Sequence, residues 1–320
     1  MATANVLTLR PGEERVSIEG SARRLMLEEQ FGDAGIHFVG VQEARSPQSE
    51  VRKGRRFTRV AAAADPGGSG GVELWVNPDL RVDLDSIFVL HSSPRLLVVS
   101  LVWESQLACF AVLHAPDLAY GAEAGAQWWA EATATLQQVR PAGSPLFIFG
   151  DTNARVGSVQ SVFVGGHQPD HETVAGEHFH QFLADLDLAV PATFSTEGEG
   201  WTWQSNCGRR HRIDYVMCPV SWLAAVVRAE VPESVSIALE DRLDHRLAWV
   251  DFAVDPPRQG GPAALYGGRF HAAHQQASPA AARCCGGTAA QVELGPFPPA
   301  WLAGRPLRAG HGLPSPPVHA

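Results

Sequence analysis

Residues 146–153 read Leu-Phe-Ile-Phe-Gly-Asp-Thr-Asn, an apolar run that ends at polar residues. Four consecutive apolar residues before a glycine are typical of a strand buried on both faces. Gly150 would allow a tight turn that directs the Asp151 carboxylate into a cleft. Alternation along an extended strand end would place Asp151 and Asn153 on the same face. A turn rich in Asp and Asn after a strand is the alternative interpretation.

The same pattern, polar residues that end or interrupt an apolar run, recurs at four other places. These residues are Asn5 in TANVLTL, Glu43 in VGVQEAR, Asp214 in RIDYV, and Asp244 with His245 in LDHR. Strand ends are where α/β proteins gather reactive side chains from distant sequence positions. A set of carboxylates and carboxamides with one imidazole indicates a hard-metal site with a positioned water, rather than a nucleophile triad.

The order of the predicted elements indicates the fold class. Residues 95–103 and 107–114 predict a hairpin, whereas 21–34 and 123–140 have the apolar spacing of helices. Ser21 is the expected N-cap of the first helix, which would bury Leu25, Met26 and Leu27 with Phe31, and Trp128 is expected on the buried face of the second. Because some strands are adjacent in sequence and others are separated by helices, we predict a four-layered α/β sandwich. Two mixed β-sheets would pack face to face with helices outside.

The composition changes at Pro256. The last 65 residues hold 11 of the 23 prolines, five arginines and a single acidic residue, Glu293. Apolar periodicity disappears there, and such a segment cannot bury enough surface to offset its ordering entropy. We therefore predict one folded domain over residues 1–255 and a disordered Pro/Gly/Ala-rich tail over residues 256–320.

Cysteine usage and hydropathy bear on location. The five cysteines, an odd number without framework spacing, favour reduced thiols and an intracellular protein, with nucleus and cytoplasm left open. Cys284 and Cys285 with His271 and His274 lack the ligand spacing of zinc sites. No run of about 18 apolar residues indicates a membrane span, and the N-terminal residues lack the pattern of a secretory signal.

The net charge of −9 argues against a nucleic-acid partner, which rewards basic surfaces. Carboxylates of a metal site contribute part of this charge, however, and a bound cation would cancel some of it. Basic residues are also clustered at 52–56 and 209–212, each next to a proposed site residue. The alternative interpretation is that both clusters are solvated loops.

The five motifs in this order resemble the endonuclease/exonuclease/phosphatase superfamily of Mg²⁺-dependent phosphoesterases, over roughly residues 2–254. No single motif is specific, and the resemblance rests on all five together. It implies a catalytic domain over residues 1–255 that uses Mg²⁺, although Mn²⁺ also suits carboxylate and water ligands. The expected metal group is Glu43, Asn5 and Asp244, and the expected catalytic group is Asp151, Asn153, Asp214, His245 and His114.

The resemblance also implies a role for each catalytic residue. Asp151 would activate the attacking water, and Asn153 would help to hold water or phosphate. His245, oriented and kept protonated by Asp214, would contact a phosphate oxygen. His114 departs from the abasic-site endonucleases, which carry a tyrosine at its position. A histidine satisfied at a strand end is the alternative for that residue.

Several strings look similar to LINE-type retrotransposon and craniofacial-development-protein-like endonucleases: LHAP, SGGVELWV, TFSTEGEGWTW and GRRHRIDYVM. The expected substrate-binding residues are Trp203, Arg210 and Arg212. A tryptophan here would stack on a base or wedge a groove, unless the paired tryptophans form a core strand. Arg212 would either orient the site or contact the nucleic-acid backbone.

The resemblance therefore implies a monomeric DNA endonuclease of retrotransposon type, which leaves 3′-hydroxyl and 5′-phosphate ends. Two alternatives stay open: a deadenylase-like RNA or nucleotide phosphoesterase, and a non-catalytic remnant of a mobile element. A remnant would be expected to have lost at least one motif residue, and Glu43, Asp151 and His245 are all present.

Overall fold

The structure is a computed structural model that describes residues 1–9, 18–78, 82–117, 120–194, 199–237 and 244–253, without the side chains of residues 18–21. All of these lie in the first of two units, Met1–Gly260. The predicted disorder over residues 256–320 lies outside the described residues. Among the described helices, none is long and apolar enough to cross a membrane.

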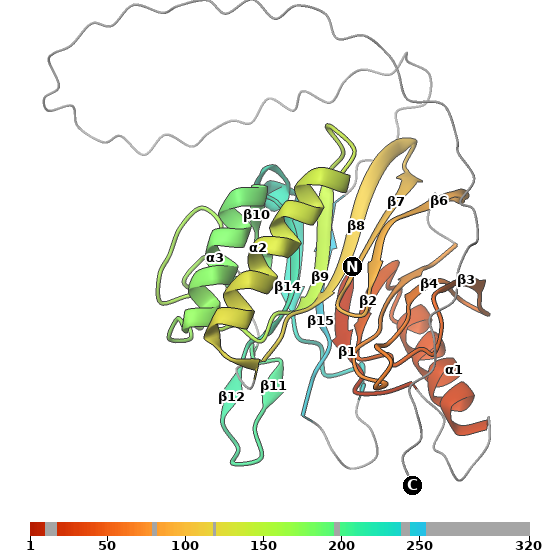
Figure 1. Cartoon of the computed structure of the whole chain (residues 1–320), viewed down its shortest axis with the longest axis horizontal. Helices are drawn as coiled ribbons and strands as arrows, with labels where there is room; N and C mark the ends of the chain where they lie inside the picture. Colours follow the sequence, from red (N-terminus) through yellow and green to blue (C-terminus); the bar gives the residue numbers. More distant parts are fainter. Residues whose placement is uncertain (10–17, 79–81, 118–119, 195–198, 238–243, 254–320) are drawn as a thin grey trace, which may run out of the picture. The chain divides into compact units, whose positions relative to one another are not determined.

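Two large mixed β-sheets form the centre of this unit (Figure 1). One has seven strands in the order β14-β15-β1-β2-β5-β4-β3, and the other has six in the order β10-β13-β9-β8-β7-β6. A separate two-stranded ribbon consists of β11 and β12. The strands are β1 (Ala2–Asn5), β2 (Phe38–Gln42), β3 (Glu50–Lys53), β4 (Thr58–Ala62), β5 (Val72–Val76), β6 (Val82–Ser93), β7 (Leu96–Trp103), β8 (Gln106–His114), β9 (Leu146–Asp151), β10 (Leu188–Ala189), β11 (Trp203–Gln204), β12 (Arg210–His211), β13 (Asp214–Pro219), β14 (Val226–Glu230) and β15 (Ala248–Phe252). The helices are α1 (Ile18–Asp33), α2 (Ala122–Val139) and α3 (Val174–Leu186), with 3₁₀ turns η2 (Pro191–Thr193) and η3 (Val220–Ala225).

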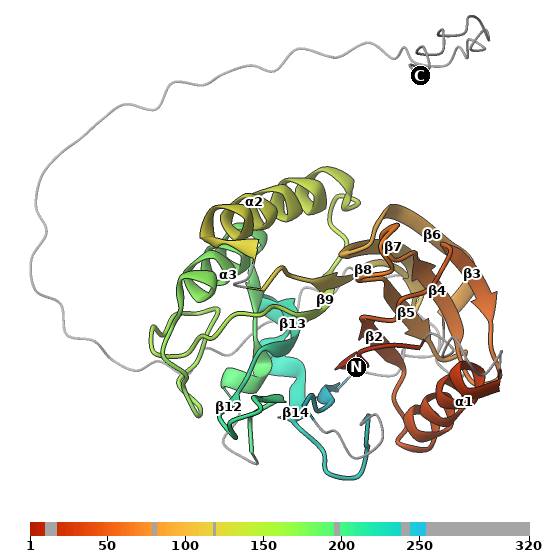
Figure 2. The same ribbon diagram turned by 60° about the horizontal axis from the view of Figure 1, so that its bottom comes forward.

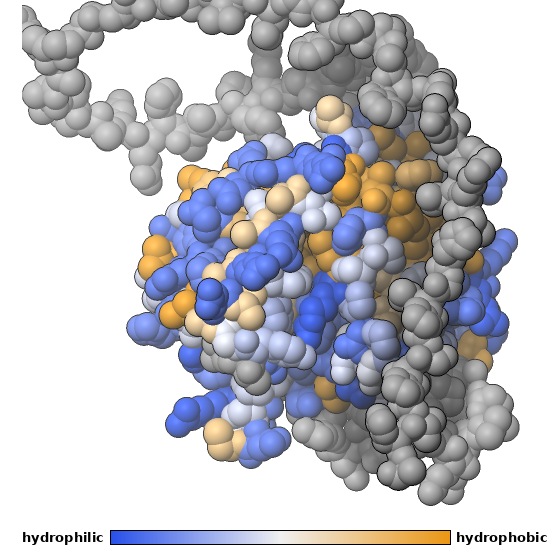
Figure 3. Space-filling model, viewed as in Figure 1, coloured by the Kyte–Doolittle hydropathy of each residue, from blue (hydrophilic) through white to orange (hydrophobic). Residues whose placement is uncertain are grey.

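Helices cover both outer faces of the paired sheets, which confirms the predicted sandwich. Figure 2 shows α1 beside the seven-stranded sheet and α2 with α3 on the opposite side, against the six-stranded sheet. The outward surface of α2 and α3 is mainly hydrophilic (Figure 3). Amphipathic helices of this kind bury one stripe against a sheet and leave the other face in water.

The two sheets approach each other closely at Gly40, in the middle of β2. A Cβ atom at Gly40 would lie 2.1 Å from the Cβ of Phe149 on β9, so only glycine fits there. The Gln42 amide donates to the Phe149 carbonyl at 3.3 Å, which joins the sheets near their polar end. Around this contact the core is aromatic, with Phe38 stacked on Phe110 at 4.4 Å between ring centroids. The ends of β1, β2 and β9 are thereby held together.

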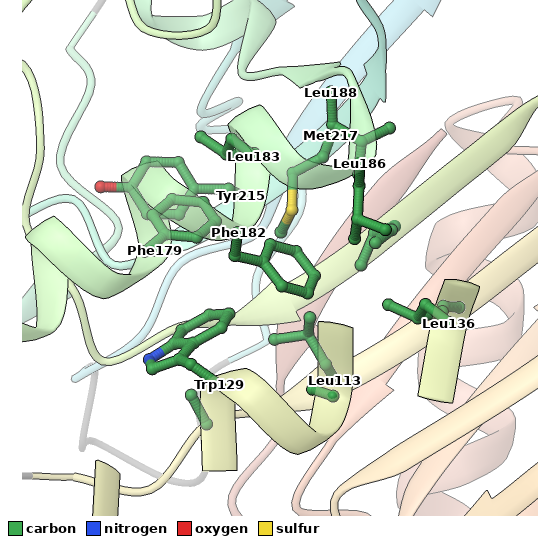
Figure 4. Packing of buried hydrophobic residues seen from close by; sticks show 14 of the residues in the cluster. Leu113, Trp129, Leu136, Phe179, Phe182, Leu183, Leu186, Leu188, Tyr215 and Met217 are labelled. Carbon is green, nitrogen blue, oxygen red and sulfur yellow. The ribbon is translucent and has the colours of Figure 1, made fainter. Parts of the chain in front are cut away.

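The α2–α3 layer packs through large side chains (Figure 4). Trp129 on α2 contacts Phe182 on α3 at 4.9 Å between ring centroids, and Phe179 contacts Tyr215 on β13 at 5.2 Å. Trp129 is only 3% exposed, whereas Trp128, the predicted core residue, is half-buried. The prediction was one residue out because adjacent positions differ by about 100° around a helix, and two neighbouring tryptophans give the apolar pattern no means of choosing.

Helix α1 also differs from the prediction. It begins at Ile18, so Ser21 lies inside the first turn and is not the N-cap. Leu27 and Phe31 are buried, as predicted, but Leu25 and Met26 are 47% and 43% exposed. Phe31 packs edge-on against Trp75 of β5 at 5.7 Å. Positions 27 and 31 are one turn apart and share a face, whereas 25 and 26 point elsewhere.

Candidate active site

Strand register brings His114, Asp151 and Asp214 into one row. β8 and β9 are parallel with His114 opposite Asp151, and β9 and β13 are antiparallel with Asp151 opposite Asp214. Directly paired positions on neighbouring strands place their side chains within contact distance. All three residues are buried, with the two aspartates each 1% exposed.

The seven-stranded sheet supplies Asn5 and Glu43 to the same place. Asn5 pairs with Gln42 across the parallel β1–β2 ladder, and Glu43 follows at once. The Asn5 amide donates to Glu43 Oε1 at 3.2 Å and to Asp151 Oδ2 at 2.9 Å, so it links the two sheets. Its carbonyl oxygen accepts the Leu7 N–H at 3.0 Å. In this arrangement Asn5 orients two carboxylates, while its own oxygen is engaged elsewhere.

The loop that carries Glu43 has an unusual backbone. Glu43 and Arg45 have φ angles of 53° and 52°, in the left-handed region that costs side-chain-bearing residues energy. The Ala44 and Arg45 N–H groups donate to the carbonyls of Gly71 and Gly70 at 2.9 and 3.0 Å. A Cβ at Gly71 would lie 2.9 Å from the Arg45 nitrogen. This close approach of glycine backbone holds Glu43 at the end of β2.

A turn, not strand alternation, positions Asn153. Its φ is 48°, its N–H donates to Asp151 Oδ1 at 3.0 Å, and its side-chain amide donates to the Ala115 carbonyl at 2.9 Å. The expectation that an extended strand end aligns Asp151 and Asn153 was therefore wrong. Gly150 likewise lies within β9 and makes no turn. It is glycine because a Cβ there would lie 2.5 Å from Leu113 Cδ1.

His245 and Asp214 form a buried pair. His245 Nδ1 lies 3.1 Å from Asp214 Oδ2, and His245 is 7% exposed. The Thr202 hydroxyl accepts the N–H of Asp214 at 3.0 Å, which fixes the start of β13. Burial alone would lower the pKa of His245, but the Asp214 carboxylate, with Asp151 and Asp244, outweighs burial and raises that pKa to about 9. The imidazole is therefore positively charged at neutral pH.

His114 is buried to the same degree but behaves oppositely. Its Nε2 lies 3.9 Å from both Glu43 Oε1 and Asp151 Oδ2, beyond hydrogen-bonding distance. Burial lowers the pKa of His114 below its ordinary value, and the two carboxylates only partly oppose this. Its Nδ1 is buried without a hydrogen-bond partner among the described residues. His114 is therefore mainly neutral near pH 7.

The carboxylates also differ from one another. Burial, and then the charge of Asp214, raise the pKa of Asp151. Burial would raise the pKa of Glu43 as well, but His114, the Asn5 amide and Arg45 lower it overall. Glu43 is thus ionised at neutral pH, whereas Asp151 binds a proton more readily than an ordinary aspartate.

One group of possible ligands to a metal occurs within the described ranges. Atoms of Asp151, Asp214 and His245 lie within 4.8 Å of one another. A protonated His245 is a hydrogen-bond donor and cannot ligate a cation, so this histidine fits the group poorly. Glu43 and Asp151, both reached by the Asn5 amide, are the better oxygen donors for a hard cation. Asp244 lines the same cleft, and its Oδ1 accepts the His245 N–H at 3.1 Å.

The predicted substrate-binding residues occupy different environments. Trp203 lines a cleft of about 770 Å³, which Glu43, Asp151 and His245 also line. Its ring stacks on His211 at 6.1 Å between centroids. The Arg210 guanidinium lies over Trp201 at 4.4 Å and donates to Gln204 at 3.0 Å. Arg212 is 6% exposed and donates to the Gly200 and His167 carbonyls at 2.7 and 3.2 Å. Its position favours the orienting alternative over contact with nucleic acid.

The cleft also contains residues that sequence reasoning missed. Arg45, Arg95 and Arg155 line it, as does Arg209 from the second basic cluster. Arg45 and Arg155 each follow a motif residue, Glu43 or Asn153, by two positions. This closeness in sequence could have identified them as residues of the site. Arg95 lies in the β6–β7 turn, where no local pattern indicates a site. The first basic cluster lies elsewhere: Arg55 and Arg56 both pair with Glu29 of α1, as solvated loops would.

The Endonuclease/Exonuclease/phosphatase family matches residues 2–264. The fold is similar to that of the endonuclease domain of TRAS1, a telomere-specific non-LTR retrotransposon, with 14% identity, a TM-score of 0.50, and coverage of 80% of this chain and 98% of that chain. It is similar to an AP endonuclease from Archaeoglobus fulgidus, with 17% identity, a TM-score of 0.56 and coverage of 79% and 98%.

A third similar structure is the 3′-5′ exonuclease NExo from Neisseria meningitidis, with 20% identity, a TM-score of 0.54 and coverage of 78% and 98%. A search of curated proteins found no matching sequence. At these identities the structures establish a shared fold, and the family match extends over most of the sequence. The chain therefore belongs to the Endonuclease/Exonuclease/phosphatase family.

Proposed function

We propose that this chain is a Mg²⁺-dependent phosphodiesterase that acts as an endonuclease on DNA, inside the cell. The observation that carries the proposal is the meeting of a protonated imidazole, a buried aspartate of raised pKa and an ionised glutamate in one arginine-lined cleft. These are the groups that in-line attack of water on a phosphodiester requires.

The residues present fit a divalent cation. Oxygens of Glu43 and Asp151 converge on the same amide group of Asn5, and carboxylate oxygen is the donor that Mg²⁺ prefers. Glu43 would hold the ion, and Asp244, which lines the same cleft, would act through water. When bound, Mg²⁺ would stabilise the negative charge that develops on the phosphoryl oxygens.

Asp151 is the group best placed to take a proton from the attacking water. Its carboxylate is held by the Asn153 N–H through one oxygen and by the Asn5 amide through the other. A raised pKa brings a carboxylate closer to the operating pH and so makes it a better base. Fixed orientation adds to this because it removes the entropy of aligning the base with the water.

His245 is the group best placed to stabilise the transition state. Its Nδ1 is occupied by Asp214, so the protonated ring has its Nε2–H left to donate. A preorganised cationic donor in a water-poor cleft stabilises charge that develops on a phosphate oxygen. Asp214 acts through His245, because it keeps the ring charged and oriented.

Two features support DNA as the substrate. Four arginines line the cleft, although the whole chain carries a net charge of −9. The stacked Trp203 and His211 rings offer a surface on which a base or sugar could pack. The retrotransposon type of endonuclease is proposed on the motifs and on the likeness in fold to the TRAS1 domain.

Nicking of supercoiled plasmid by the full chain, with Mg²⁺ or with EDTA, tests the proposal. Wild-type protein should nick only with metal, and Asp151→Asn should not nick. Cleavage of single-stranded adenylate RNA without plasmid nicking would replace DNA with RNA as the substrate. Absence of activity on DNA, RNA and nucleotides would identify the chain as a non-catalytic remnant.

A further inference from the structure

The four arginines of the cleft divide into two kinds. Arg45 donates to Glu43 Oε2 at 3.0 Å, and Arg95 donates to the His114 carbonyl at 3.1 Å and lies over the Tyr120 ring. Arg155 and Arg209 also line the cleft. Within the described part of the chain, no hydrogen bond or ion pair engages either of their guanidinium groups. Two cationic heads in the cleft are thus left without a protein partner.

The backbone of Arg155 is nevertheless fixed. Its carbonyl accepts the Thr173 N–H at 3.3 Å, and a Cβ at Gly176 of α3 would lie 2.1 Å from that same oxygen. Beyond it, the Asp170 N–H donates to the Val156 carbonyl at 3.2 Å. The half-buried Arg155 side chain therefore projects from a rigid support. A half-buried guanidinium loses part of its hydration, and an anion that contacted it would offset that loss.

The neighbouring wall carries a second carboxylate–imidazole pair. His211 Nδ1 lies 3.1 Å from Asp170 Oδ1, while Asp170 Oδ2 accepts the Arg212 N–H at 3.3 Å. The ring packs on Trp203 with an interplanar angle of 18°, and its side chain is 19% exposed in the cleft. Because Nδ1 is engaged, Nε2 is the ring atom left for a ligand. The proposed hydrolysis, which uses Asp151, Asp214 and His245, has no role for this pair.

Asp170 joins these groups into one surface. It pairs with Val156 next to Arg155, and it holds His211 at the end of the β12 strand that Arg209 precedes. We infer that Arg155, Arg209 and His211 form a second phosphate-binding position, which engages the phosphate next to the one being cleaved. This inference rests on the proposed phosphodiesterase function. It adds that the substrate is a polynucleotide strand with more than one phosphate, not a small phosphoester.

Two substrates separate this role from catalysis. A dinucleoside monophosphate has only the scissile phosphate, whereas an oligonucleotide also has neighbours for the second position. Arg155→Ala and Arg209→Ala should each lower kcat/KM on the oligonucleotide about tenfold, as expected for loss of a charge-assisted phosphate contact. Both should stay within about twofold of wild type on the dinucleotide. Each variant should also reduce the slope of log(kcat/KM) against log[salt] by about the amount expected for one phosphate contact.

Three further variants sharpen the test. Arg155→Lys should keep the salt dependence, because it keeps the charge. His211→Gln should lower kcat/KM on the oligonucleotide severalfold. Arg52→Ala is the matched control, because it removes the same charge from a residue that is exposed on β3, at the far edge of the seven-stranded sheet. This variant should change kcat/KM on neither substrate.

The outcomes distinguish the inference from the function on which it rests. Suppose that the wild-type protein cleaves the oligonucleotide and that the kcat/KM values of Arg155→Ala, Arg209→Ala and His211→Gln all stay within twofold of wild type. That result would overturn the second phosphate position but not the proposed function. Equal losses on both substrates would also overturn it, and would assign these residues to the site of hydrolysis or to folding. If the wild-type protein cleaves no polynucleotide, the proposed function and the inference both fall.

Discussion

His245 and His114 are equally buried in one cleft, at 7% and 8% exposure, yet their pKa values move in opposite directions. His245 has one carboxylate at hydrogen-bonding distance, 3.1 Å, whereas His114 has two carboxylates at 3.9 Å. At His245 the carboxylates of Asp214, Asp151 and Asp244 together outweigh the cost of burying the charge. At His114 two carboxylates do not, and the charges of Arg95 and His245 lower its pKa further. The hydrogen bond to Asp214 and the surrounding charges therefore set which imidazole carries the positive charge.

The consequence is a division of labour between the two sides of the cleft. In the proposed reaction, the Asp214–His245 side would supply a fixed cation for the phosphate. The other side holds His114 mainly neutral, and its carboxylates, Glu43 and Asp151, would serve a metal and a water.

Asp151 lies between the two histidines, and its replacement should have the largest effect. Asp151→Asn should lower kcat roughly 10³- to 10⁴-fold, because the amide cannot accept the proton of the attacking water. The melting temperature should change little, since an amide oxygen can still accept one of the two hydrogen bonds. Single-turnover DNA cleavage with Mg²⁺ measures the first and thermal unfolding the second. Retained cleavage would remove Asp151 from the role of base.

The pair itself can be broken at Asp214. Asp214→Asn should lower the pKa of His245 from about 9, because the charge and the hydrogen bond of Asp214 are lost and only the Asp151 and Asp244 carboxylates still oppose burial. Cleavage at pH 7.5 should fall roughly 10²- to 10³-fold. An NMR pH titration of the His245 ring protons would follow the pKa directly.

The double variant is the control for this pair. The variant with both His245→Ala and Asp214→Asn should lose about as much activity as the more damaging single variant. The effects of residues that act as one unit are strongly non-additive. Losses that multiply would mean that Asp214 does not act through His245.

Glu43 tests the opposite side of the cleft. Glu43→Gln should raise the Mg²⁺ concentration for half-maximal cleavage roughly ten- to a hundredfold, because one anionic oxygen ligand is lost. The maximal rate at saturating metal should fall less than in Asp151→Asn. An unchanged Mg²⁺ titration would show that Glu43 is not a ligand.

The smallest expected effect is on how the free energy of unfolding depends on pH in metal-free buffer. The folded-state pKa of His245, about 9, lies above its unfolded value near 6.5, so its stabilisation is fully present below pH 6.5 and is lost as pH rises through 9. The pKa of His114 is lowered, so its contribution is present above pH 6.5 and is lost on acidification. The shift of His245 should contribute roughly 3 kcal/mol to the free energy of unfolding below pH 6.5.

Denaturant unfolding from pH 5 to 10 in EDTA checks this. His245→Ala should flatten the alkaline side of the stability curve, and His114→Ala should flatten the acid side. Identical curves for both variants would contradict the opposite shifts.

Much of the fold follows from local pattern. Apolar runs that end in polar residues predicted β2, β9 and the β7–β8 hairpin, because buried strands need continuous apolar side chains. The pattern does not predict β6, which lies at a sheet edge. Apolar and polar residues are mixed along its 12 positions, and all of them are exposed or half-buried. The buried faces of α1 and α2 were partly misassigned, because neighbouring apolar residues leave the rotation of a helix undecided until it packs.

By itself, the sequence determined which side chains meet, since strand ends in an α/β fold converge and the five motifs mark those ends. Tertiary structure alone decided their states and partners. The turn at Asn153, the neutral His114, the engaged Arg212 and the unpaired Arg155 all depend on distances between residues far apart in the chain. Hydrogen bonding and Coulomb energy change steeply over such distances, and no local pattern in the sequence encodes them.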